Sequence, residues 1–330
     1  MYTSDDAEVS AAVKALAEGL LVAFPTETVY GLGADATSPE AVARIFAAKS
    51  RPTDHPLIVH VGRHKDLHRF GRNVDVKAER LVAAFWPGPL TIIVERADEI
   101  VFETTGGRET VGLRMPDHPL ALALLNGFAD IGSGAVAAPS ANRFGGVSPT
   151  TAQHVRHDLG DKVAVILDGG PCRVGVESTI VDLSGERPQL LRPGGISSVE
   201  IEAVLGHTLD DGRSAPSRAP GMLESHYAPA AQIVLVDPTD LAGIDFRNDE
   251  GLLAVRDDRT PTTWQLSSRP PSAELMWMLP ADAGAYATEL YATLRDADRR
   301  GVRRLLVMPP TSGELMDAVL DRLAKAAAPR

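Results

Sequence analysis

The sequence predicts an α/β fold with a mixed sheet and flanking helices, followed by a second, smaller α/β domain. Short apolar runs bounded by glycine and proline recur along the 330 residues and are typical of buried strands. Segments with helical spacing of apolar residues lie between these runs, but not in strict alternation, which favours a mixed sheet over a purely parallel one. Residues 207–231 are rich in glycine, serine, proline and charge. We therefore expect domains over residues 1–206 and 232–330, joined by a linker over residues 207–231.

The composition is that of an ordinary globular protein, with 44% hydrophobic and 23% charged residues. No run approaches the ~18–20 apolar residues of a membrane span, and the start of the chain has no signal-peptide pattern, so we expect a cytoplasmic protein. A single cysteine, Cys172, cannot form an intrachain disulfide. The formal net charge of −11 argues against a broad nucleic-acid groove, which would be basic.

The first strand-helix-strand unit spans residues 20–61. The apolar run at residues 20–24 suits a buried strand, and the polar segment after it leads to Gly31 and Gly33, which we interpret as a loop that turns tightly or approaches a ligand. Ser38 is a capping residue with proline at the next position, so a helix is expected from there to about Ala48. Residues 57–61 form the second strand. Ligand sites of open α/β sheets form at such strand ends.

The remaining elements follow from the same patterns. In the first domain we expect helices over residues 10–18, 77–85, 120–125, 152–159 and 198–205, and strands over 90–94, 110–116, 163–167, 178–183 and 189–191. In the second domain we expect strands over 233–236, 251–255, 275–279 and 304–308, and a helix with apolar residues at 287, 290, 291 and 294. A last helix is predicted to start at a capping box over residues 311–314 and to bury Met316, Val319, Leu320 and Leu323.

Two cations, Lys49 and Arg51, follow the end of the first unit's helix. The helix dipole alone favours cations there, and a phosphate clamp is an equally good interpretation, with lysine as a compact charge and arginine as a planar fork. The sequence Gly31-Leu32-Gly33 lacks the third glycine of a dinucleotide fingerprint, and no G-x-x-x-x-G-K-[ST] motif is present. If the protein binds ATP, it uses neither of these two common phosphate cradles.

Short polar residues, Ser140, Asn142 and Ser148, follow another apolar segment. By composition, turn and helix-cap chemistry is their more frequent role, although they can also donate hydrogen bonds to phosphate or to developing negative charge. Arg114 ends a predicted strand, where an arginine is usually solvated, and His60 lies in an apolar strand, where it is usually a core histidine. The histidine pair in the helix predicted over residues 152–159 is better explained as a solvated face, so we predict no metal site.

Four motifs make the sequence similar to the YrdC-like threonylcarbamoyl-AMP synthases. They are FPTETVYGLG at residues 24–33, K-x-R-P at 49–52 with LIVHV at 57–61, S-x-N at 140–142, and VESTI at 176–180. Their combination is specific, whereas each alone is weak. The second domain indicates the long, two-domain form of the family. The resemblance implies a YrdC-like twisted mixed sheet with flanking helices, followed by a smaller Rossmann-like α/β domain.

The resemblance implies a nucleotidyltransferase that condenses L-threonine, bicarbonate or CO2, and ATP into threonylcarbamoyl-AMP and pyrophosphate. This product serves the formation of threonylcarbamoyladenosine in tRNA. The implied partners are downstream threonylcarbamoyl-transferase proteins, with tRNA reached indirectly and no membrane. Mg²⁺ is expected with ATP, and no organic cofactor is expected. The linker at residues 207–231 is expected to act as a lid over the bound nucleotide.

Lys49 and Arg51 are the implied catalytic residues, because both reacting groups come from substrates and the protein must align them and neutralise charge. The implied ATP-binding residues are Lys49, Arg51, His55, Thr110, Ser140, Asn142, Ser148, Arg192 and Tyr227. The implied threonine-binding residues are Thr28, His60, Arg114, Ala138 through its backbone, and Ser178.

Two other functions remain open from the sequence. One is an RNA-binding module without catalysis, which the negative net charge and the lack of a basic stripe interleaved with aromatics disfavour. The other is carbamoyl-phosphate-dependent carbamoyl transfer, which related domains perform inside larger maturation proteins. The sequence shows no zinc-finger or acylphosphatase-like region of the kind those proteins carry. The choice of substrate distinguishes the two enzymes.

Overall fold

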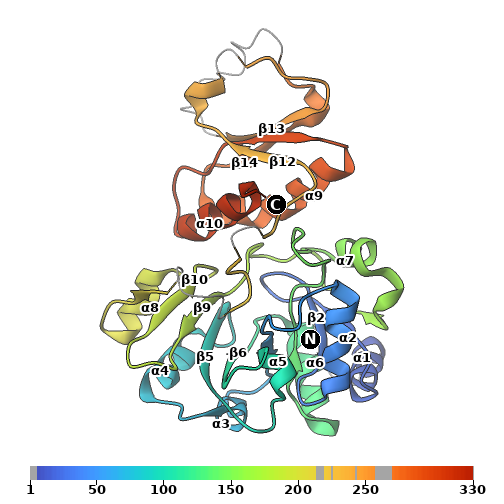
Figure 1. The fold of residues 1–330 in the computed structure, drawn as a ribbon, viewed down its shortest axis with the longest axis vertical. Helices are drawn as coiled ribbons and strands as arrows, with labels where there is room; N and C mark the ends of the chain where they lie inside the picture. The colour runs from blue at the N-terminus through green and yellow to red at the C-terminus, as the bar shows by residue number, and fades with distance from the viewer. Residues whose placement is uncertain (1–5, 213–218, 224–225, 242–243, 257–269, 330) are drawn as a thin grey trace. The chain divides into compact units, whose positions relative to one another are not determined.

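A computed structural model describes residues 6–329 except for residues 213–218, 224–225, 242–243 and 257–269 (Figure 1). The chain forms two compact units. The first contains Met1–Phe144 and Ser148–Met222, and the second contains Gly145–Val147 and Leu223–Arg330. The chain therefore passes into the second unit after Met222, inside the segment that the sequence predicts as a linker.

The first unit combines short strands with helices in an irregular order. Its strands are β1 (Val22–Phe24), β2 (Gly31–Asp35), β3 (Ile58–His60), β4 (Gly71–Arg72), β5 (Leu90–Arg96), β6 (Thr110–Arg114), β7 (Val136–Ala137), β8 (Val165–Ile166), β9 (Thr179–Asp182), β10 (Gln189–Arg192) and β11 (Asp210–Asp211). Its helices are α1 (Ala7–Ala17), α2 (Pro39–Lys49), α3 (Asp66–Phe70), α4 (Val76–Phe85), α5 (Phe102–Thr105), α6 (Pro119–Ile131), α7 (Ala152–Leu159) and α8 (Ser198–Leu205), with a 3-10 turn, η1 (Gly160–Lys162).

These strands form one mixed sheet in the order β11-β10-β9-β5-β6-β3-β7-β2-β1-β8, with β4 beside β5. The pairs β3–β6 and β5–β9 are parallel, whereas β5–β6 and β1–β2 are antiparallel. Helices cover both faces of the sheet (Figure 1). Along β1, Val22 and Phe24 pack with α1 and α6, and Ala23 between them belongs to the cluster that contains the apolar face of α2. The predicted mixed sheet with flanking helices is confirmed.

Gly31 and Gly33 lie in strand β2, so the prediction of a glycine loop at these positions is wrong. Strand β2 forms an antiparallel hairpin with β1, and residues 25–30, which include the polar residues Thr26, Glu27 and Thr28, form the connection. A Cβ atom on Gly33 would lie 2.8 Å from Val136 Cγ1 and 2.9 Å from Phe24 Cε1. Glycine is therefore needed here for close packing within the sheet, and the polar turn beside it is free to carry the functional groups.

The second unit is built on a parallel sheet. Its strands are β12 (Gln232–Leu235), β13 (Glu250–Arg256), β14 (Met276–Pro280) and β15 (Arg304–Val307), in the order β12-β15-β13-β14. Its helices are α9 (Ala283–Arg299) and α10 (Met316–Ala327), with 3-10 segments η2 (Pro238–Leu241) and η4 (Ala273–Leu275). This arrangement is the smaller Rossmann-like α/β domain that the sequence predicts.

The start of helix α10 differs from the prediction. Leu315 precedes the helix and provides no side-chain cap, so the predicted capping box at residues 311–314 is wrong. Val319 and Leu323 are buried as predicted, whereas Leu320 is 40% exposed. The apolar face follows the i, i+4 pair of Val319 and Leu323, and Leu320 lies one position away from it.

The segment predicted as a linker is divided between the two units. Asp210 and Asp211 form β11 and extend the first unit's sheet beside β10. Further along, Ala219 packs on the first unit's apolar residues Ile58, Ile93, Ile180 and Leu191. His226 and Tyr227 belong to the second unit.

Candidate functional site

The central strands of the first unit bring His60 and Arg114 next to each other. Strands β3 and β6 run parallel with His60 in register with Arg114, and β7 places Val136 on the other side of His60. Ala138 follows β7, and its N–H donates to the Ile58 carbonyl at 2.9 Å. The predicted threonine-binding residues His60 and Arg114 therefore lie at the adjacent carboxyl ends of β3 and β6, whereas Ala138 lies beside Ile58, at the start of β3.

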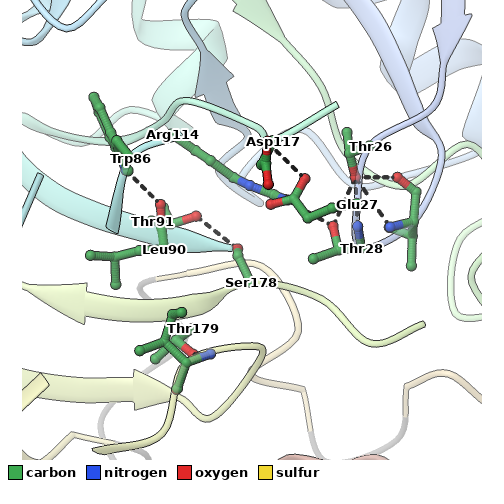
Figure 2. Close-up of polar contacts among 12 residues, drawn as sticks. Thr26, Glu27, Thr28, Trp86, Leu90, Thr91, Arg114, Asp117, Ser178 and Thr179 are labelled. Atoms are coloured by element: carbon green, nitrogen blue, oxygen red, sulfur yellow. Dashed lines mark hydrogen bonds and ion pairs between the residues drawn. The ribbon is translucent and has the colours of Figure 1, made fainter. Parts of the chain in front are cut away.

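The turn between β1 and β2 holds Arg114 (Figure 2). Nη2 of Arg114 lies 2.7 Å from Glu27 Oε1 and donates to Thr28 Oγ1 at 2.9 Å. The Glu27 side chain is 0% exposed, and its Oε2 accepts from the Asp117 N–H at 3.1 Å. Within the described residues, Arg114 Nε is buried and donates no hydrogen bond. A fixed, buried guanidinium with an unused donor is suited to binding a carboxylate.

The same turn also fixes the hydroxyl group of Thr28. Thr26 donates its single hydroxyl hydrogen to the Val29 carbonyl at 2.6 Å. The 2.8 Å contact between the two threonine hydroxyls then requires Thr28 to donate to Thr26. Thr28 Oγ1 is therefore the acceptor for Arg114, and the turn orients both groups together.

His60 is buried and neutral. Burial, together with the positive charge of Arg114, lowers the pKa of His60 from 6.5 to about 3. Its ring meets the ring of Phe24 edge to face, with the centroids 6.0 Å apart. Nδ1 of His60 has no hydrogen-bond partner in the part of the chain that the structure describes. A neutral imidazole can accept or donate a hydrogen bond without adding charge to the pocket.

Ser178 and Arg192 form a second polar network beside β5 and β9. Nε and Nη2 of Arg192 donate to the Ser178 carbonyl at 3.1 and 2.9 Å, and Nη2 also donates to Ser178 Oγ at 3.1 Å. Ser178 Oγ lies 2.8 Å from Thr91 Oγ1 (Figure 2). Nη1 of Arg192 donates to the Pro220 carbonyl at 3.0 Å. Arg192 thus connects a predicted threonine-binding residue to residues 219–222.

The predicted phosphate-binding residues gather at the C-terminal end of α2. Lys49 is the last residue of this helix, and its Nζ donates to the carbonyls of Ser140 at 2.6 Å and Asn142 at 2.5 Å. Ser50 ends the helix with a left-handed backbone at φ 54°. Ser140 Oγ in turn donates to Asn142 Oδ1. One buried lysine therefore fixes the S-x-N segment against the helix end.

Arg51 and His55 share the aromatic ring of Phe144. The Arg51 guanidinium lies 5.4 Å from the ring centroid, and the His55 ring meets it edge to face at 5.4 Å. Phe144 also donates its N–H to the Lys49 carbonyl at 3.0 Å. Burial and the charge of Arg51 lower the pKa of His55. The structure therefore brings five predicted ATP-binding residues together: Lys49, Arg51, His55, Ser140 and Asn142.

Two more predicted ATP-binding residues of the first unit have separate surroundings. Ser148 is buried, and its Oγ donates to Glu177 Oε1 at 2.6 Å. Thr110, at the start of β6, lines a small cavity whose wall includes Thr91 and Ala219. Ala219, from the segment predicted as a lid, therefore lines the same cavity as a predicted ATP-binding residue.

Tyr227, the last predicted ATP-binding residue, belongs to the second unit. Its ring is 1% exposed and stacks on the ring of Tyr291, with the centroids 6.0 Å apart. The guanidinium of Arg322 lies 4.9 Å from the Tyr227 centroid. The backbone of Tyr227 is left-handed, with φ 60°. These contacts anchor Tyr227 in the core of the second unit.

Sequence reasoning overlooked two buried carboxylates of the first unit that contact predicted site residues. Glu27 is 1% exposed and pairs with Arg114, and Glu177 is 6% exposed and accepts from Ser148. A signal for Glu27 was present, because the acid lies only three residues after the end of a predicted buried strand. A buried carboxylate needs a cation or several hydrogen-bond donors, so such an acid points to a basic partner elsewhere in the chain.

Among the described residues, no group of three or more His, Cys, Asp or Glu side chains could hold a metal ion. The same part of the chain has no helix that is both long enough and apolar enough to cross a membrane.

Comparison with known proteins identifies the family. A family model described as "Telomere recombination" matches residues 14–194, and one described as "Threonylcarbamoyl-AMP synthase, C-terminal domain" matches residues 196–328. The threonylcarbamoyl-AMP synthase of Pyrococcus abyssi is 42% identical over 315 residues, which cover 94% of this chain and 91% of that protein. The chain belongs to the threonylcarbamoyl-AMP synthase family.

A second relative and a solved structure support this membership. The threonylcarbamoyl-AMP synthase of Bacillus subtilis is 46% identical over 241 residues, covering 71% of this chain and 68% of that protein. The crystal structure of P. abyssi Sua5 complexed with L-threonine matches with a TM-score of 0.85 at 36% identity, covering 97% of this chain and 94% of that one. The predicted family, its two-domain form and the expectation of a nucleotidyltransferase-type enzyme of tRNA modification are confirmed.

Proposed function

We propose that this chain condenses L-threonine, bicarbonate or CO2, and ATP into threonylcarbamoyl-AMP and pyrophosphate, for threonylcarbamoyladenosine formation in tRNA. The main observation behind this proposal is that the first unit contains two clusters of buried, hydrogen-bonded polar side chains. One is the buried Arg114 with its unused donor, and the other is the buried cation pair Lys49 and Arg51 beside the S-x-N segment. Membership of the threonylcarbamoyl-AMP synthase family supports the same reaction.

We assign the threonine carboxylate to Arg114. Glu27 and Thr28 engage Nη2 of this arginine, and the buried Nε, which has no hydrogen-bond partner among the described residues, is left to donate to a carboxylate. His60 adds a neutral hydrogen-bonding group on the neighbouring strand. The proposed threonine-binding residues are Thr28, His60, Arg114, Ala138 through its backbone, and Ser178.

We assign the ATP phosphates to the cluster at the end of α2. Lys49 and Arg51 are the proposed catalytic residues, because they place two buried positive charges next to the hydrogen-bonding groups of Ser140 and Asn142. The proposed ATP-binding residues are Lys49, Arg51, His55, Thr110, Ser140, Asn142, Ser148, Arg192 and Tyr227.

In the proposed reaction, the threonine amine first adds to CO2 and loses a proton to give a carbamate. A carbamate oxygen then attacks the α-phosphorus of ATP, and the bond from that phosphorus to the bridging oxygen breaks, so that pyrophosphate leaves with the electron pair. Because both reacting groups come from substrates, the protein aligns them and stabilises negative charge. Lys49, Arg51 and Arg192 supply the positive charge, and Arg114 with Thr28 aligns the amino acid.

Further parts of the proposal concern the metal ion and the lid. We propose that Mg²⁺ enters with ATP through phosphate oxygens and water, since the described residues offer no cluster of ligands for it. We propose residues 207–231 as a lid that protects the labile mixed anhydride from water. Two contacts of the lid's described part support this role, namely the hydrogen bond from Arg192 to Pro220 and the packing of Ala219.

We propose residues 1–206 as the catalytic domain and residues 232–330 as a supporting domain. The enzyme is proposed to act in the cytoplasm and to pass its product to threonylcarbamoyl-transferase proteins that modify tRNA. The proposed compartment follows from the predicted reaction, because its substrates and its tRNA target are expected in the cytoplasm.

The test of the proposed function uses the full chain with ATP and Mg²⁺. Pyrophosphate release and an AMP-containing product are measured with L-threonine and bicarbonate each present or omitted. We expect pyrophosphate release that requires both L-threonine and bicarbonate. Pyrophosphate release that occurs with carbamoyl phosphate in place of bicarbonate would favour the carbamoyl-transfer alternative. If folded protein released no pyrophosphate under any of these conditions, synthase activity would be contradicted.

A further inference from the structure

Glu27 places a negative charge beside the arginine that we assign to the threonine carboxylate. Glu27 Oε1 and Arg114 Nη2 lie 2.7 Å apart, and the Glu27 side chain is 0% exposed. A pocket that had only to bind a carboxylate would attract it more strongly without a second carboxylate at this distance. The presence of Glu27 therefore requires its own explanation.

Glu27 is held in place through its carboxylate and through its backbone. Oε2 accepts from the Asp117 N–H at 3.1 Å, and the backbone carbonyl of Glu27 accepts from the Val174 N–H at 2.8 Å. The adjacent Thr28 binds the same guanidinium at 2.9 Å. Glu27 is therefore a fixed counter-charge of Arg114 and not a mobile group that moves aside for a substrate.

The charges around this pair sum to zero. His60 is neutral beside Arg114, because burial lowers its pKa to about 3. Burial raises the pKa of Cys172 to about 12 and lowers the pKa of His118, so these two groups near Glu27 are uncharged at neutral pH. The buried charged side chains at this pair are Arg114 and Glu27. Ser178, which we also assign to the threonine site, has a second such couple beside it, the buried guanidinium of Arg192 and the neighbouring buried carboxylate of Glu177.

We propose that Glu27 is a specificity-determining residue: its fixed carboxylate balances Arg114, so that the pocket accepts a zwitterionic α-amino acid and discriminates against a carboxylate that has no ammonium group. The inference rests on the proposed function and specifies how its amino-acid pocket selects a substrate.

The physical basis is the cost of burying net charge. A zwitterion adds no net charge to the neutral pocket. Its carboxylate can lie toward Arg114 and its ammonium toward Glu27. A hydroxy acid of the same shape brings an uncompensated negative charge into a buried site, which is unfavourable. Replacing Glu27 by glutamine reverses this balance, because Arg114 then carries a positive charge that a lone anion neutralises.

The test measures binding to the full chain by calorimetry at neutral pH, without ATP. The two ligands are L-threonine and (2S,3R)-2,3-dihydroxybutanoate, in which a hydroxyl replaces the ammonium group. For the wild type we expect threonine to bind at least about 100-fold more tightly. For Glu27→Gln we expect this ratio to fall about tenfold or more, with threonine binding weaker and the hydroxy acid binding tighter.

The control variant is Asp117→Asn. It changes one nearby carboxylate to an amide but keeps the backbone N–H that binds Glu27. Its own carboxylate pairs at the surface with Arg173, which is 63% exposed. We expect the binding ratio of this control to stay within about twofold of the wild type.

A different result overturns the inference. If Glu27→Gln weakens both ligands equally, Glu27 merely holds Arg114 in position. If wild type binds no threonine at all, the proposed function fails first, which separates the two failures.

Two further measurements test the inference if the Glu27→Gln variant does not fold. Glu27→Asp keeps the charge, and we expect it to keep the preference for threonine, whereas a loss of preference in this folded variant contradicts the inference. In wild type, L-threonine methyl ester brings a positive charge without a carboxylate. We expect both this ester and the hydroxy acid to bind at least about tenfold more weakly than threonine. If the hydroxy acid bound wild type as tightly as threonine does, the idea that Glu27 balances the charge of Arg114 in the pocket would be contradicted.

Discussion

Replacing Lys49 by methionine should lower kcat/KM for ATP about 100- to 1000-fold. Methionine keeps an unbranched apolar stem of similar length but removes the charge and all three donors. Nζ of Lys49 donates to the carbonyls of Ser140 at 2.6 Å and Asn142 at 2.5 Å, so its position at the end of α2 is fixed before the reaction. Loss of one such preorganised group costs about 2.7–4 kcal/mol of transition-state stabilisation. Each 1.36 kcal/mol corresponds to about tenfold in rate, which gives the stated range.

The same substitution has a separate cost in folding stability. The two carbonyls lose their donor, and a buried carbonyl without a partner costs about 1–3 kcal/mol. The thermal midpoint of the first unit should therefore fall by several degrees. This fall must be measured independently, because a partly unfolded variant would also lose activity.

The assay is pyrophosphate release at saturating L-threonine and bicarbonate with ATP varied, on protein shown to be folded by circular dichroism. Lys162→Met is the matched control, because Nζ of Lys162 donates to the Ala48 carbonyl at the same helix end, at 3.1 Å. This control should change kcat/KM less than about twofold. A folded Lys49→Met variant within about threefold of the wild type would refute the assignment of Lys49 to the phosphates.

Three further predictions concern buried groups of the first unit. His60 has a pKa of about 3 in the folded chain against 6.5 when exposed, so on acidification the unfolded state takes up the proton first, and the free energy of unfolding falls below pH 6.5 by about 1.4 kcal/mol per pH unit. Between neutral pH and about pH 4.5, the thermal midpoint of His60→Gln should therefore fall less than that of the wild type. Parallel curves of thermal midpoint against pH for the two proteins would contradict this. Gly33→Ala should destabilise the fold by about 1–3 kcal/mol in urea titrations, because its Cβ would lie 2.8 Å from Val136 Cγ1. Gly185→Ala, whose Cβ would have its nearest neighbouring atom at 4.0 Å, should change stability by less than about 0.5 kcal/mol, and equal effects of the two substitutions would argue against the packing explanation. Burial raises the pKa of Cys172 to about 12, so a thiol reagent should label the native chain very slowly at about pH 8 and rapidly in denaturant, whereas fast labelling of native protein would count against a buried thiol.

Helix α2 shows what local sequence predicts well. Ser38 accepts from the Ala41 N–H as an N-cap, Pro39 begins the helix, and the buried face includes Val42 and Ile45. All of these signals lie within a dozen neighbouring residues, and they act through short-range geometry. The position of Lys49 and Arg51 at the end of this helix followed from the same local pattern.

Strand β2 and the Arg114 pocket show where local sequence is insufficient. Glycines at positions 31 and 33 are typical of a loop, and only the side chains of Phe24 and Val136 on neighbouring strands explain them as strand residues. Arg114 and Thr28 are 86 residues apart, and the parallel pairing of β3 with β6 makes the pocket. The role of Glu27 depends on that long-range pairing, so the acid could be noticed from sequence but its partner could not be named.

The attachment of residues 219–222 to the first unit determines how the chain can be divided. A fragment ending at residue 206 would lose β11 from the sheet edge beside β10 and the Pro220 carbonyl that binds Arg192. It would also uncover the apolar patch under Ala219, which consists of Ile58, Ile93, Ile180 and Leu191. A minimal stand-alone form of the first unit should therefore extend to Met222, and shorter fragments should expose this patch and associate through it.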